Sequence, residues 1–378
     1  IRRGGTRPTA SPVEATDWVS RKPARRCQLR SVSVIIPTYN RCHLLSEAIE
    51  SVIRQDVKDC GLEIIVVDDG STDDTADVVK SFGSRVRYLY QKNRGAGVAR
   101  NHGIEAATGE WIAFLDSDDR WLRNKLSLQF AALEAFPDYR AVHSNFYTFC
   151  GESVSIEDGL RFWLKCADGS DKIDWLDIYG KAYDSSGLAR VPGNPERPLR
   201  IYGGNLFSAL LARPCATCIT LLIARDSLTP EMRFAENYPT WEDYWFFCRL
   251  SERHDLLFLD IPTAENRAHT GPRLTQAKVR QTLECYIDMC DKIYIPSTSP
   301  HRPPTETILQ RRRMANTALF KEYLKDGYVS KARAMIHPSR LRTEFALDFP
   351  FVLYGMASWL PLNPTHRLVR LKRALAPE

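Results

Sequence analysis

Residues 111–119 read Trp-Ile-Ala-Phe-Leu-Asp-Ser-Asp-Asp, an apolar run that ends in three carboxylates within four positions. Carboxylates this close raise one another's pKa unless a cation or several hydrogen-bond donors hold them. The run therefore predicts a buried strand with a divalent-metal site, formed by Asp116, Asp118 and Asp119, at its carboxyl end, with Asp118 and Asp116 as the main ligands. An alternative stays open here: a helical pattern begins at Trp121, and the cluster, Asp119 above all, could cap that helix.

The residues before this run alternate between strand-like and helix-like patterns. Short β-branched runs, typical of strands buried on both faces of a parallel sheet, lie at 31–36, 63–67 and 86–90. Apolar residues at helical spacing follow at 44–53, 75–82 and 97–107. Strands that alternate with helices predict an α/β fold with a doubly wound, mostly parallel, Rossmann-like sheet and right-handed crossovers.

The second half of the chain is less regular. Residues 150–200 lack a sustained period, which predicts loops and short elements around a cleft. We expect a strand at 216–223, a helix at 241–250 and a strand at 256–261. From about residue 276 the pattern is helical, with the longest segments at 279–293 and 305–324, which predicts a separate packing layer.

Composition bounds the class of protein. The 378 residues are 44% hydrophobic and 26% charged, which is ordinary for a soluble globular protein. The net charge of +6 is uneven, because the first 30 residues hold eight basic and two acidic side chains among Pro, Ser and Thr. That segment predicts a mobile basic arm, and it is not a signal peptide because no apolar core follows its basic start.

Cysteines and the C-terminal segment bear on location. The ten cysteines are scattered, often in apolar runs, and indicate reduced, buried thiols of a cytoplasmic protein. Residues 349–362 are apolar but hold two prolines, and they fall short of the roughly 20 residues that a membrane-spanning helix needs. A basic tail follows. The apolar segment and the basic tail together predict either a peripheral contact with the inner face of the membrane or a helix packed on the rest of the protein.

Polar side chains follow three of the predicted strands. They are Pro37, Thr38, Tyr39 and Asn40; Asp68 and Asp69; and Asp116, Ser117 and Asp118. Parallel neighbours place such loops at one sheet edge, so these residues should line one crevice. A ring for stacking, a carboxylate for a base N–H and a metal site are the parts of a nucleotide-diphosphate pocket. Arg94 and Arg100 add guanidinium groups on a glycine loop that leads into a helix.

Four segments in order resemble the signatures of the family 2 inverting glycosyltransferases, which have the GT-A fold. They lie at 33–40, 66–73, 93–101 and 114–119, and the resemblance covers about residues 32–130. The resemblance implies that Pro37 and Tyr39 contact the nucleoside and that Asp69 binds the base ring. It implies that Arg100 helps to bind the nucleotide. Asp116 would touch the ribose or sugar, and Asp118 would hold Mn²⁺ or Mg²⁺ on the diphosphate.

A looser match lies at 237–245, which is similar to the family's Glu-Asp pair at the start of an acceptor-side helix. It implies that Asp243 is the general base, with Glu242 in the same catalytic pair. The acceptor hydroxyl must lose its proton as it attacks, and a metal must take the charge of the leaving group. Alternatively, the two acids only cap a helix. Residues 267–273 resemble the basic loop that closes over the diphosphate, but with an atypical Gly-Pro-Arg; His269 there is a further metal ligand or a surface histidine.

The expected function is therefore a metal-dependent inverting glycosyltransferase. It would move one sugar from a nucleotide sugar to a saccharide or lipid-linked acceptor in polysaccharide synthesis. A UDP-sugar is the expected donor. The expected domains are the arm at 1–30, a GT-A domain at 31–275 with its nucleotide-sugar half at 31–130 and its acceptor half at 131–275, and a helical region at 276–378. A non-catalytic nucleotide-sugar or carbohydrate-binding protein of the same fold is the alternative. A sugar nucleotidyltransferase is disfavoured because residues 37–40 are not a glycine-rich basic loop, and no nucleic-acid partner is expected.

Overall fold

The computed structural model describes residues 30–57, 60–151, 153–168, 173–185, 199–268 and 279–335, with the side chains of 166–168 left aside. The predicted basic arm before Arg30, the loop around His269 and the segment at 349–373 lie outside the described residues.

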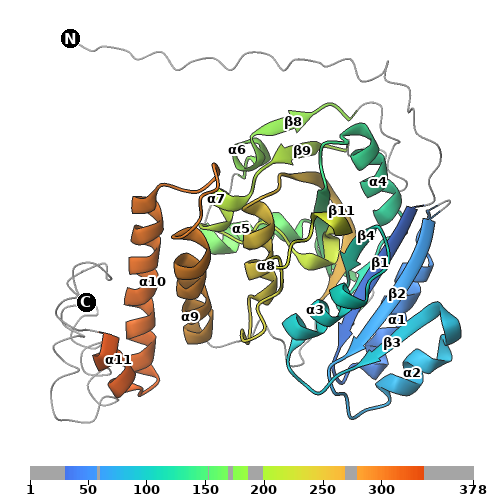
Figure 1. Cartoon of the computed structure of the whole chain (residues 1–378), viewed down its shortest axis with the longest axis horizontal. Helices are drawn as coiled ribbons and strands as arrows, with labels where there is room; N and C mark the ends of the chain where they lie inside the picture. The colour runs from blue at the N-terminus through green and yellow to red at the C-terminus, as the bar shows by residue number, and fades with distance from the viewer. Residues whose placement is uncertain are drawn as a thin grey trace.

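A single mixed sheet runs through the molecule, with the strand order β3-β2-β1-β4-β10-β6-β11-β9-β8 (Figure 1). Its first four strands are β1 (Arg30–Thr38), β2 (Cys60–Asp68), β3 (Val86–Tyr90) and β4 (Trp111–Phe114). β1 pairs in parallel with β2 and with β4, and β2 pairs in parallel with β3. The predicted parallel strands are confirmed.

Helices α1 (Cys42–Ile53), α2 (Thr75–Ser81) and α3 (Ala96–Ala106) connect these strands, and a short turn, η2 (Gly83–Arg85), precedes β3. α1 buries Leu45, Ala48, Ile49 and Val52, the apolar face that its sequence spacing predicts. α3 packs on β1 and β2. It approaches β1 closely because Gly103 has no side chain: a Cβ there would lie 2.4 Å from Cγ2 of Ile35.

The other half of the sheet is mixed. β10 (Leu222–Ala224) lies between β4 and β6 (Ala141–Cys150) and is antiparallel to both, while β11 (Leu256–Arg267) runs parallel to β6. β9 (Ile201–Gly204) and β8 (Lys181–Tyr183) complete the edge, and the short strands β5 (Arg120–Trp121) and β7 (Ser153–Ile156) pair with β11 and β6. The helical elements here are α4 (Lys125–Ala135), α5 (Gly159–Asp168), α6 (Trp175–Tyr179), α7 (Phe207–Leu210), η3 (Cys218–Thr220), η4 (Arg225–Ser227) and α8 (Glu242–Ser251).

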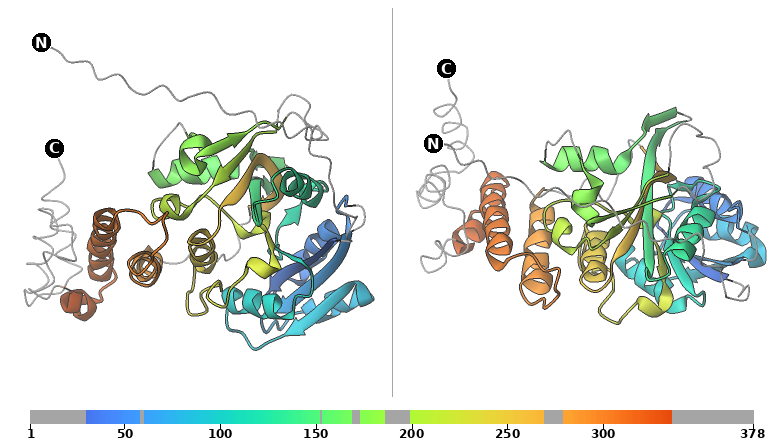
Figure 2. Two further views of the ribbon diagram at one scale, coloured as in Figure 1. Left: turned by 45° about the horizontal axis from the view of Figure 1, so that its top comes forward. Right: turned by 90° about the horizontal axis from the view of Figure 1, so that it is seen from above.

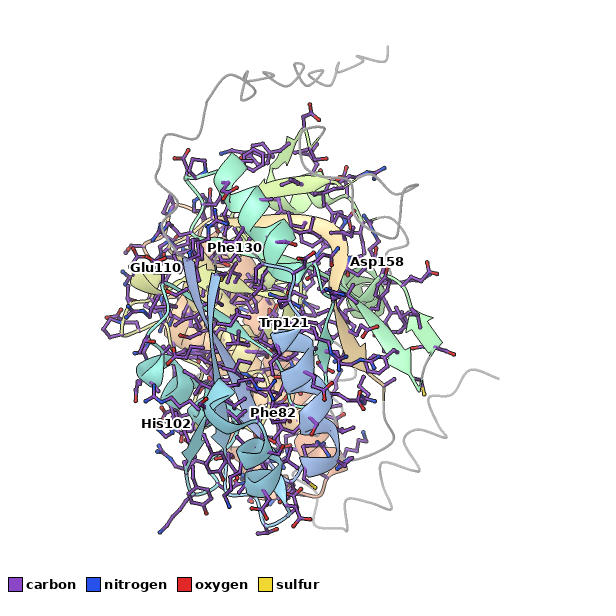
Figure 3. The ribbon with its side chains drawn as sticks, turned by 90° about the vertical axis from the view of Figure 1, so that its right-hand side faces the viewer. Phe82, His102, Glu110, Trp121, Phe130 and Asp158 are labelled. Atoms are coloured by element: carbon purple, nitrogen blue, oxygen red, sulfur yellow. The ribbon has the colours of Figure 1, made fainter. Side chains whose placement is uncertain are left out.

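The strand predicted at 216–223 is wrong in its first part, where the turn η3 forms instead. The carbonyl groups of that turn bind side chains rather than a neighbouring strand. The ring N–H of Trp121 donates to the carbonyl of Ile219 at 2.8 Å, and Nε2 of Gln129 donates to the carbonyl of Thr220 at 2.6 Å. Trp121, which is labelled in Figure 3, also contacts α1, because its backbone N–H donates to Oγ of Ser51 at 3.1 Å.

The described part of the C-terminal region is helical, as predicted. α9 (Val279–Met289), the π-helical turn η6 (Cys290–Tyr294), α10 (Thr305–Lys325) and α11 (Val329–Met335) lie at the end of the molecule opposite β1–β3 (Figure 2). Met289, Ile293, Tyr294 and Ile308 belong to the same core as the sheet, whereas α10 and α11 share a smaller cluster around Phe320. No described helix is both long and apolar enough to cross a bilayer.

Candidate functional site

The loops after β1 and β2 meet at one sheet edge, as predicted. Thr38 is the register partner of Asp68, and the N–H of Asp69 donates to the carbonyl of Thr38 at 2.9 Å. Asn40 has a positive φ of 51°, a conformation that asparagine tolerates. Its Oδ1 accepts from the N–H of Thr72 at 2.8 Å, and its N–H donates to Oγ of Ser71 at 2.9 Å. Asn40 therefore braces the two loops against each other.

Asp68 and Asp69 are both buried and hydrogen-bonded. Asp68 accepts from the N–H of Ser71 at 2.8 Å and from the hydroxyl of Tyr88 at 2.6 Å. Asp69 accepts three hydrogen bonds: from the N–H of Arg94 at 2.8 Å, from the N–H of Gly95 at 2.7 Å and from Nε2 of Gln91 at 2.8 Å. Because a carboxylate offers about four acceptor positions, Asp69 holds the loop before α3 and keeps room for one further donor.

The side chains around this loop differ in their exposure to solvent. Tyr39 is 47% exposed, so its ring is available for stacking, whereas Pro37 and Thr38 are buried. The hydroxyl of Thr38 has no hydrogen-bond partner among the described residues. Arg94 lies at the surface and pairs with Glu236 at 3.2 Å.

The carboxylates after β4 form a tight turn. The N–H of Asp119 donates to the carbonyl of Asp116 at 3.1 Å, and Ser117 between them is buried. The side chains of Asp116 and Asp118 are 36% and 24% exposed, and they lie 2.7 Å from Nη2 of Arg100 and 3.9 Å from Nε of Arg41 respectively. Burial raises the pKa of Asp116; Arg100 lowers it and the charge of Asp118 raises it further.

Asp119 does not cap the helix that follows. α4 begins only at Lys125, with Asn124 at its N-cap, because β5 intervenes. Asp119 is buried and accepts from the N–H of Arg267 at 2.8 Å and from Nδ2 of Asn266 at 3.1 Å. Burial and the charges of Asp118 and Asp116 raise its pKa well above the usual range. The helix-cap alternative for Asp119 is therefore wrong, and this carboxyl ties the end of β11 to the turn.

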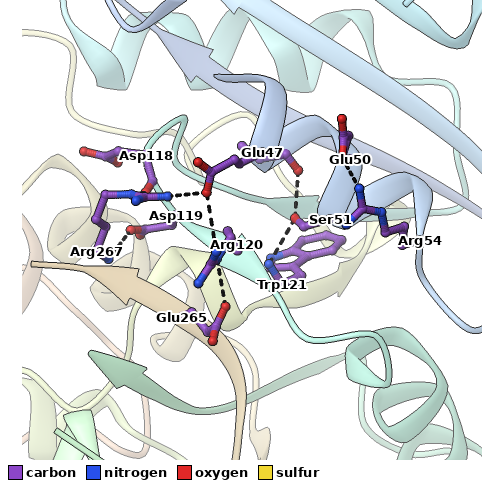
Figure 4. Close-up of polar contacts among 11 residues, drawn as sticks. Glu47, Glu50, Ser51, Arg54, Asp118, Asp119, Arg120, Trp121, Glu265 and Arg267 are labelled. Carbon is purple, nitrogen blue, oxygen red and sulfur yellow. Dashed lines mark hydrogen bonds and ion pairs between the residues drawn. The ribbon is translucent and has the colours of Figure 1, made fainter. Parts of the chain in front are cut away.

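An ion-pair network supports the same turn from α1 and β11 (Figure 4). Glu47 on α1 pairs with Nη2 of Arg267 at 2.6 Å and with Nη1 of Arg120 at 3.4 Å. Nε of Arg120 pairs with Glu265 at 2.9 Å, and Nε of Arg267 donates to the carbonyl of Asp118 at 2.9 Å. Arg267 thus contacts the backbone carbonyl of Asp118 and the carboxylates of Asp119 and Glu47, which fixes the turn between α1 and β11.

The carboxylates of Asp116 and Asp118 fit a metal ion that binds together with a diphosphate. No group of three or more His, Cys, Asp or Glu side chains within the described residues could hold a metal ion alone. Asp116 and Asp118, however, offer two partly exposed carboxylates on one turn. Mg²⁺ and similar ions bind through one or two carboxylates and fill their other positions with phosphate oxygens and water. His269 lies outside the described residues, so its predicted role as a ligand stays a prediction.

Helix α8 brings two more carboxylates to this edge. It begins with Glu242 and Asp243 after Trp241, which has a positive φ of 66°. Glu242 is buried and accepts from Nη1 of Arg100 at 2.8 Å, while Oδ1 of Asp243 accepts from the N–H of Tyr244 at 2.7 Å. The N-cap residue of α8 is Trp241 and makes no side-chain cap hydrogen bond, so neither carboxylate is the cap of this helix. Burial and the charge of Glu242 raise the pKa of Asp243 to about 7, against the opposing effect of Arg100.

The loops after β1, β2 and β4 lie in a segment that matches a known family. The model of glycosyl transferase family 2 matches residues 33–185, which include the loops after β1, β2 and β4 and the start of α3. The similarity to glycosyl transferase family 2 thus lies in residues 33–185. The family 2 segment covers the predicted nucleotide-sugar half and ends before α8, so the assignment of Glu242 and Asp243 stays a prediction.

Curated relatives match mainly this segment. An uncharacterized glycosyltransferase of Rickettsia felis is 48% identical over 105 residues, 27% of this chain and 17% of its own length. A putative teichuronic acid biosynthesis glycosyltransferase, TuaG of Bacillus subtilis, is 37% identical over 34% of this chain and 49% of its own length. A GalNAc(5)-diNAcBac-PP-undecaprenol beta-1,3-glucosyltransferase of Campylobacter jejuni is 46% identical over 25% of this chain and 32% of its own length. The chain thus spans less than half of each of these relatives.

Solved structures extend the likeness beyond the family 2 segment. Residues 1–349 of S. aureus TarS in complex with UDP-GlcNAc are 17% identical, with a TM-score of 0.52 over 82% of this chain and 77% of that one. The same protein in complex with UDP gives a TM-score of 0.52 over 87% of both chains. At this identity the likeness concerns the fold alone, and it confirms the GT-A expectation.

Proposed function

We propose that this chain is a metal-dependent inverting glycosyltransferase, which moves one sugar from a UDP-sugar to a saccharide or lipid-linked acceptor in polysaccharide synthesis. The observation that carries the proposal is the guanidinium of Arg100. It contacts Asp116 at the end of β4 at 2.7 Å and Glu242, the neighbour of Asp243, at 2.8 Å. One buried group thus joins Asp116, on the side suited to the leaving group, with Glu242, which precedes the carboxylate suited to the acceptor.

The donor-side residues bind and orient in this proposal. Tyr39 stacks on the base, and the remaining acceptor position of Asp69 takes a base N–H. Asp116 and Asp118 hold Mn²⁺ or Mg²⁺, which neutralises charge on the leaving diphosphate. The partly exposed side chains of Asp116 and Asp118 and their shared turn support this assignment.

The acceptor-side residue moves a proton. Asp243 takes the proton of the acceptor hydroxyl while the hydroxyl oxygen forms a bond to the anomeric carbon. The bond from that carbon to the diphosphate oxygen breaks, and its electron pair leaves with the diphosphate. Attack from the opposite face inverts the anomeric configuration. A general base works best when its pKa lies near the working pH, and the raised pKa of Asp243, about 7, supports this role.

The choice of substrates rests on the relatives. TarS is described with UDP-GlcNAc, and the names of two curated relatives include teichuronic acid and an undecaprenol-linked glycan. UDP-sugars are therefore the first donors to test, and lipid-linked or polymeric saccharides are the first acceptors.

The test combines binding with turnover. Thermal unfolding is measured with UDP-, GDP- and dTDP-sugars, each with and without Mn²⁺, followed by the rate of donor hydrolysis. We expect a metal-dependent rise in Tm with UDP-sugars and slow, Mn²⁺-dependent hydrolysis. No metal-dependent stabilisation by any nucleotide sugar would refute the donor site, and stabilisation without hydrolysis or transfer would favour the non-catalytic binding protein.

Peripheral membrane contact through residues 349–373 is part of the proposal. The apolar aromatic segment and the basic tail that follows it support this contact. Co-sedimentation with anionic liposomes should fall after truncation at about residue 345. Equal binding by the full and the truncated chain would exclude a role for this segment.

A further inference from the structure

Helix α3 joins the two halves of the proposed site. Asn101 mimics a backbone pairing with Phe234: its Oδ1 accepts from the N–H of Phe234 at 2.9 Å, and its Nδ2 donates to the carbonyl at 3.0 Å. At Gly97, a Cβ would lie 2.6 Å from the carbonyl oxygen of Ala235 and 3.2 Å from Cβ of Glu242. The absence of a side chain at Gly97 therefore lets α3 lie directly against the segment that leads into α8.

Arg100, one turn after Gly97, is the charged link at this contact. It is 5% exposed, its two terminal nitrogens each bind a different carboxylate, and its guanidinium lies 5.3 Å from the ring centroid of Phe234. A guanidinium is planar and presents its donors in a fixed fork, so the two carboxylates that it holds take a defined separation. Its Nε is buried and has no hydrogen-bond partner among the described residues.

We propose that Arg100 and Glu242 are positioning residues, which fix Asp243 relative to Asp116, and that Arg100 does not bind the nucleotide directly. The inference rests on the proposed function and goes beyond it. Both terminal nitrogens of Arg100 are already engaged by protein carboxylates. Glu242 is the first residue of α8 and Asp243 is the second, so any shift of Glu242 moves Asp243 as well.

Two substitutions of Glu242 separate position from charge. Glu242→Asp keeps the charge and shortens the side chain by one methylene, whereas Glu242→Gln keeps the length and one acceptor oxygen. A misplacement of about 1 Å costs up to about 100-fold in rate. We therefore expect Glu242→Asp to lower kcat by about 10- to 100-fold, and Glu242→Gln to lower it much less. A group that moves a proton would give the opposite order, which would overturn the proposal.

Arg100→Lys keeps the charge and loses the fork. We expect kcat to fall while the KM for the donor stays within about twofold, because no interaction with bound donor is removed. A rise of about tenfold or more in this KM, with kcat unchanged, would assign Arg100 to the nucleotide instead. Glu252→Gln is the matched control: Glu252 pairs with Arg249 at 3.1 Å at the far end of α8, and neither constant should change.

A thermodynamic cycle tests the bridge without turnover. Tm is measured for Asp116→Asn, Glu242→Asp and the double variant, because residues that share a partner are not additive. We expect a double-variant shift that differs from the sum, whereas Asp116→Asn combined with Glu252→Gln should add. Additive shifts in both pairs would refute the bridge. A wild-type chain that hydrolyses no donor would contradict the proposed function, and the cycle would then still decide whether Arg100 couples the two carboxylates.

Discussion

The carboxylate of Asp119 accepts a hydrogen bond from the backbone N–H of Arg267 at 2.8 Å, across 148 positions of sequence. The side chain of Arg267 returns to the same turn and donates to the carbonyl of Asp118 at 2.9 Å. The end of β11 and the turn after β4 are therefore held as one piece. Three of the predictions that follow concern how such supports act on the carboxylates of the site.

Asp119→Ala should destabilise the fold, because it leaves the N–H of Arg267 and the amide of Asn266 without their acceptor. An unsatisfied buried donor costs about 1–3 kcal/mol, so we expect a loss of that order in the free energy of unfolding from chemical denaturation. Asp77→Ala is the control, since Asp77 is exposed and forms a surface ion pair with Lys80. Equal stability of the two variants would show that Asp119 does not hold β11.

Glu47→Gln should weaken metal binding without unfolding the protein. Glu47 is 47% exposed, so its ion pairs with Arg267 and Arg120 contribute less than about 1 kcal/mol to stability. They orient the turn that carries Asp118, and we expect about a threefold to tenfold higher Mn²⁺ concentration for half-maximal donor hydrolysis. Glu50→Gln, one turn along α1 and paired with Arg54, is the matched control. The same Mn²⁺ requirement in both variants would separate Glu47 from the metal.

Asp243→Asn should abolish transfer and spare donor binding. Loss of a general base costs about 100- to 10,000-fold in rate, while the residues proposed to bind UDP and Mn²⁺ lie on the other side of Arg100. In the wild type, kcat should rise with pH through about 7, because only the deprotonated carboxylate accepts the proton. Turnover by Asp243→Asn at the wild-type rate, or a flat pH profile, would remove Asp243 as the base.

The same carboxyl should make stability depend on pH. Its folded pKa, about 7, lies above its usual value of 3.8, so between these values the folded state holds a proton that the unfolded state has lost. The free energy of unfolding therefore falls as pH rises through this window. Asp243→Asn avoids this loss. We expect its Tm to match the wild type near pH 4 and to exceed it near pH 8, by about 1–2 °C per kcal/mol gained for a chain of this length. An equal Tm difference at both pH values would contradict the raised pKa.

Gly97→Ala should push α3 away from α8, because the new Cβ meets the carbonyl oxygen of Ala235 at 2.6 Å. Overpacking of this kind costs about 1–3 kcal/mol, and here it should also lower turnover through Arg100. Gly61→Ala is the control: its nearest atoms would lie 3.8 Å away and the site is distant in the sheet. Normal turnover with lowered stability in Gly97→Ala would mean that the helix contact serves the fold only.

The sequence predicts the parallel half of the molecule well, because each of its strands is a short apolar run that stops at a polar loop. β6 was not predicted, since it buries His143, Ser144 and Asn145 among its apolar residues and shows no strand-like alternation. The prediction of a strand at 216–223 failed where the side chains of Trp121 and Gln129, 98 and 91 positions away, bind the carbonyl groups. Partners that distant depend on packing, which local patterns do not contain.

The candidate site likewise contains residues that the sequence predicts and residues that it does not. Asp116, Asp118 and Asp243 can be picked out from their place after an apolar strand or at a helix start. The pairing of Arg100 with Glu242, 142 positions apart, cannot be read locally, because it depends on the close approach of α3 to α8. Glu47 and Arg267 gave no signal as supports of the turn, since isolated charges at such positions usually face solvent.

β10 brings residues from outside the matched segment into the middle of the sheet. The segment that matches the family ends at residue 185, yet β10 (Leu222–Ala224) lies between β4 and β6 and hydrogen-bonds to both. A fragment that stops at 185 would leave the facing edges of β4 and β6 unpaired in the middle of the sheet. The stretch most shared with relatives is therefore not a unit that folds alone. In this chain, the strand that closes the middle of the sheet is supplied by residues beyond that stretch.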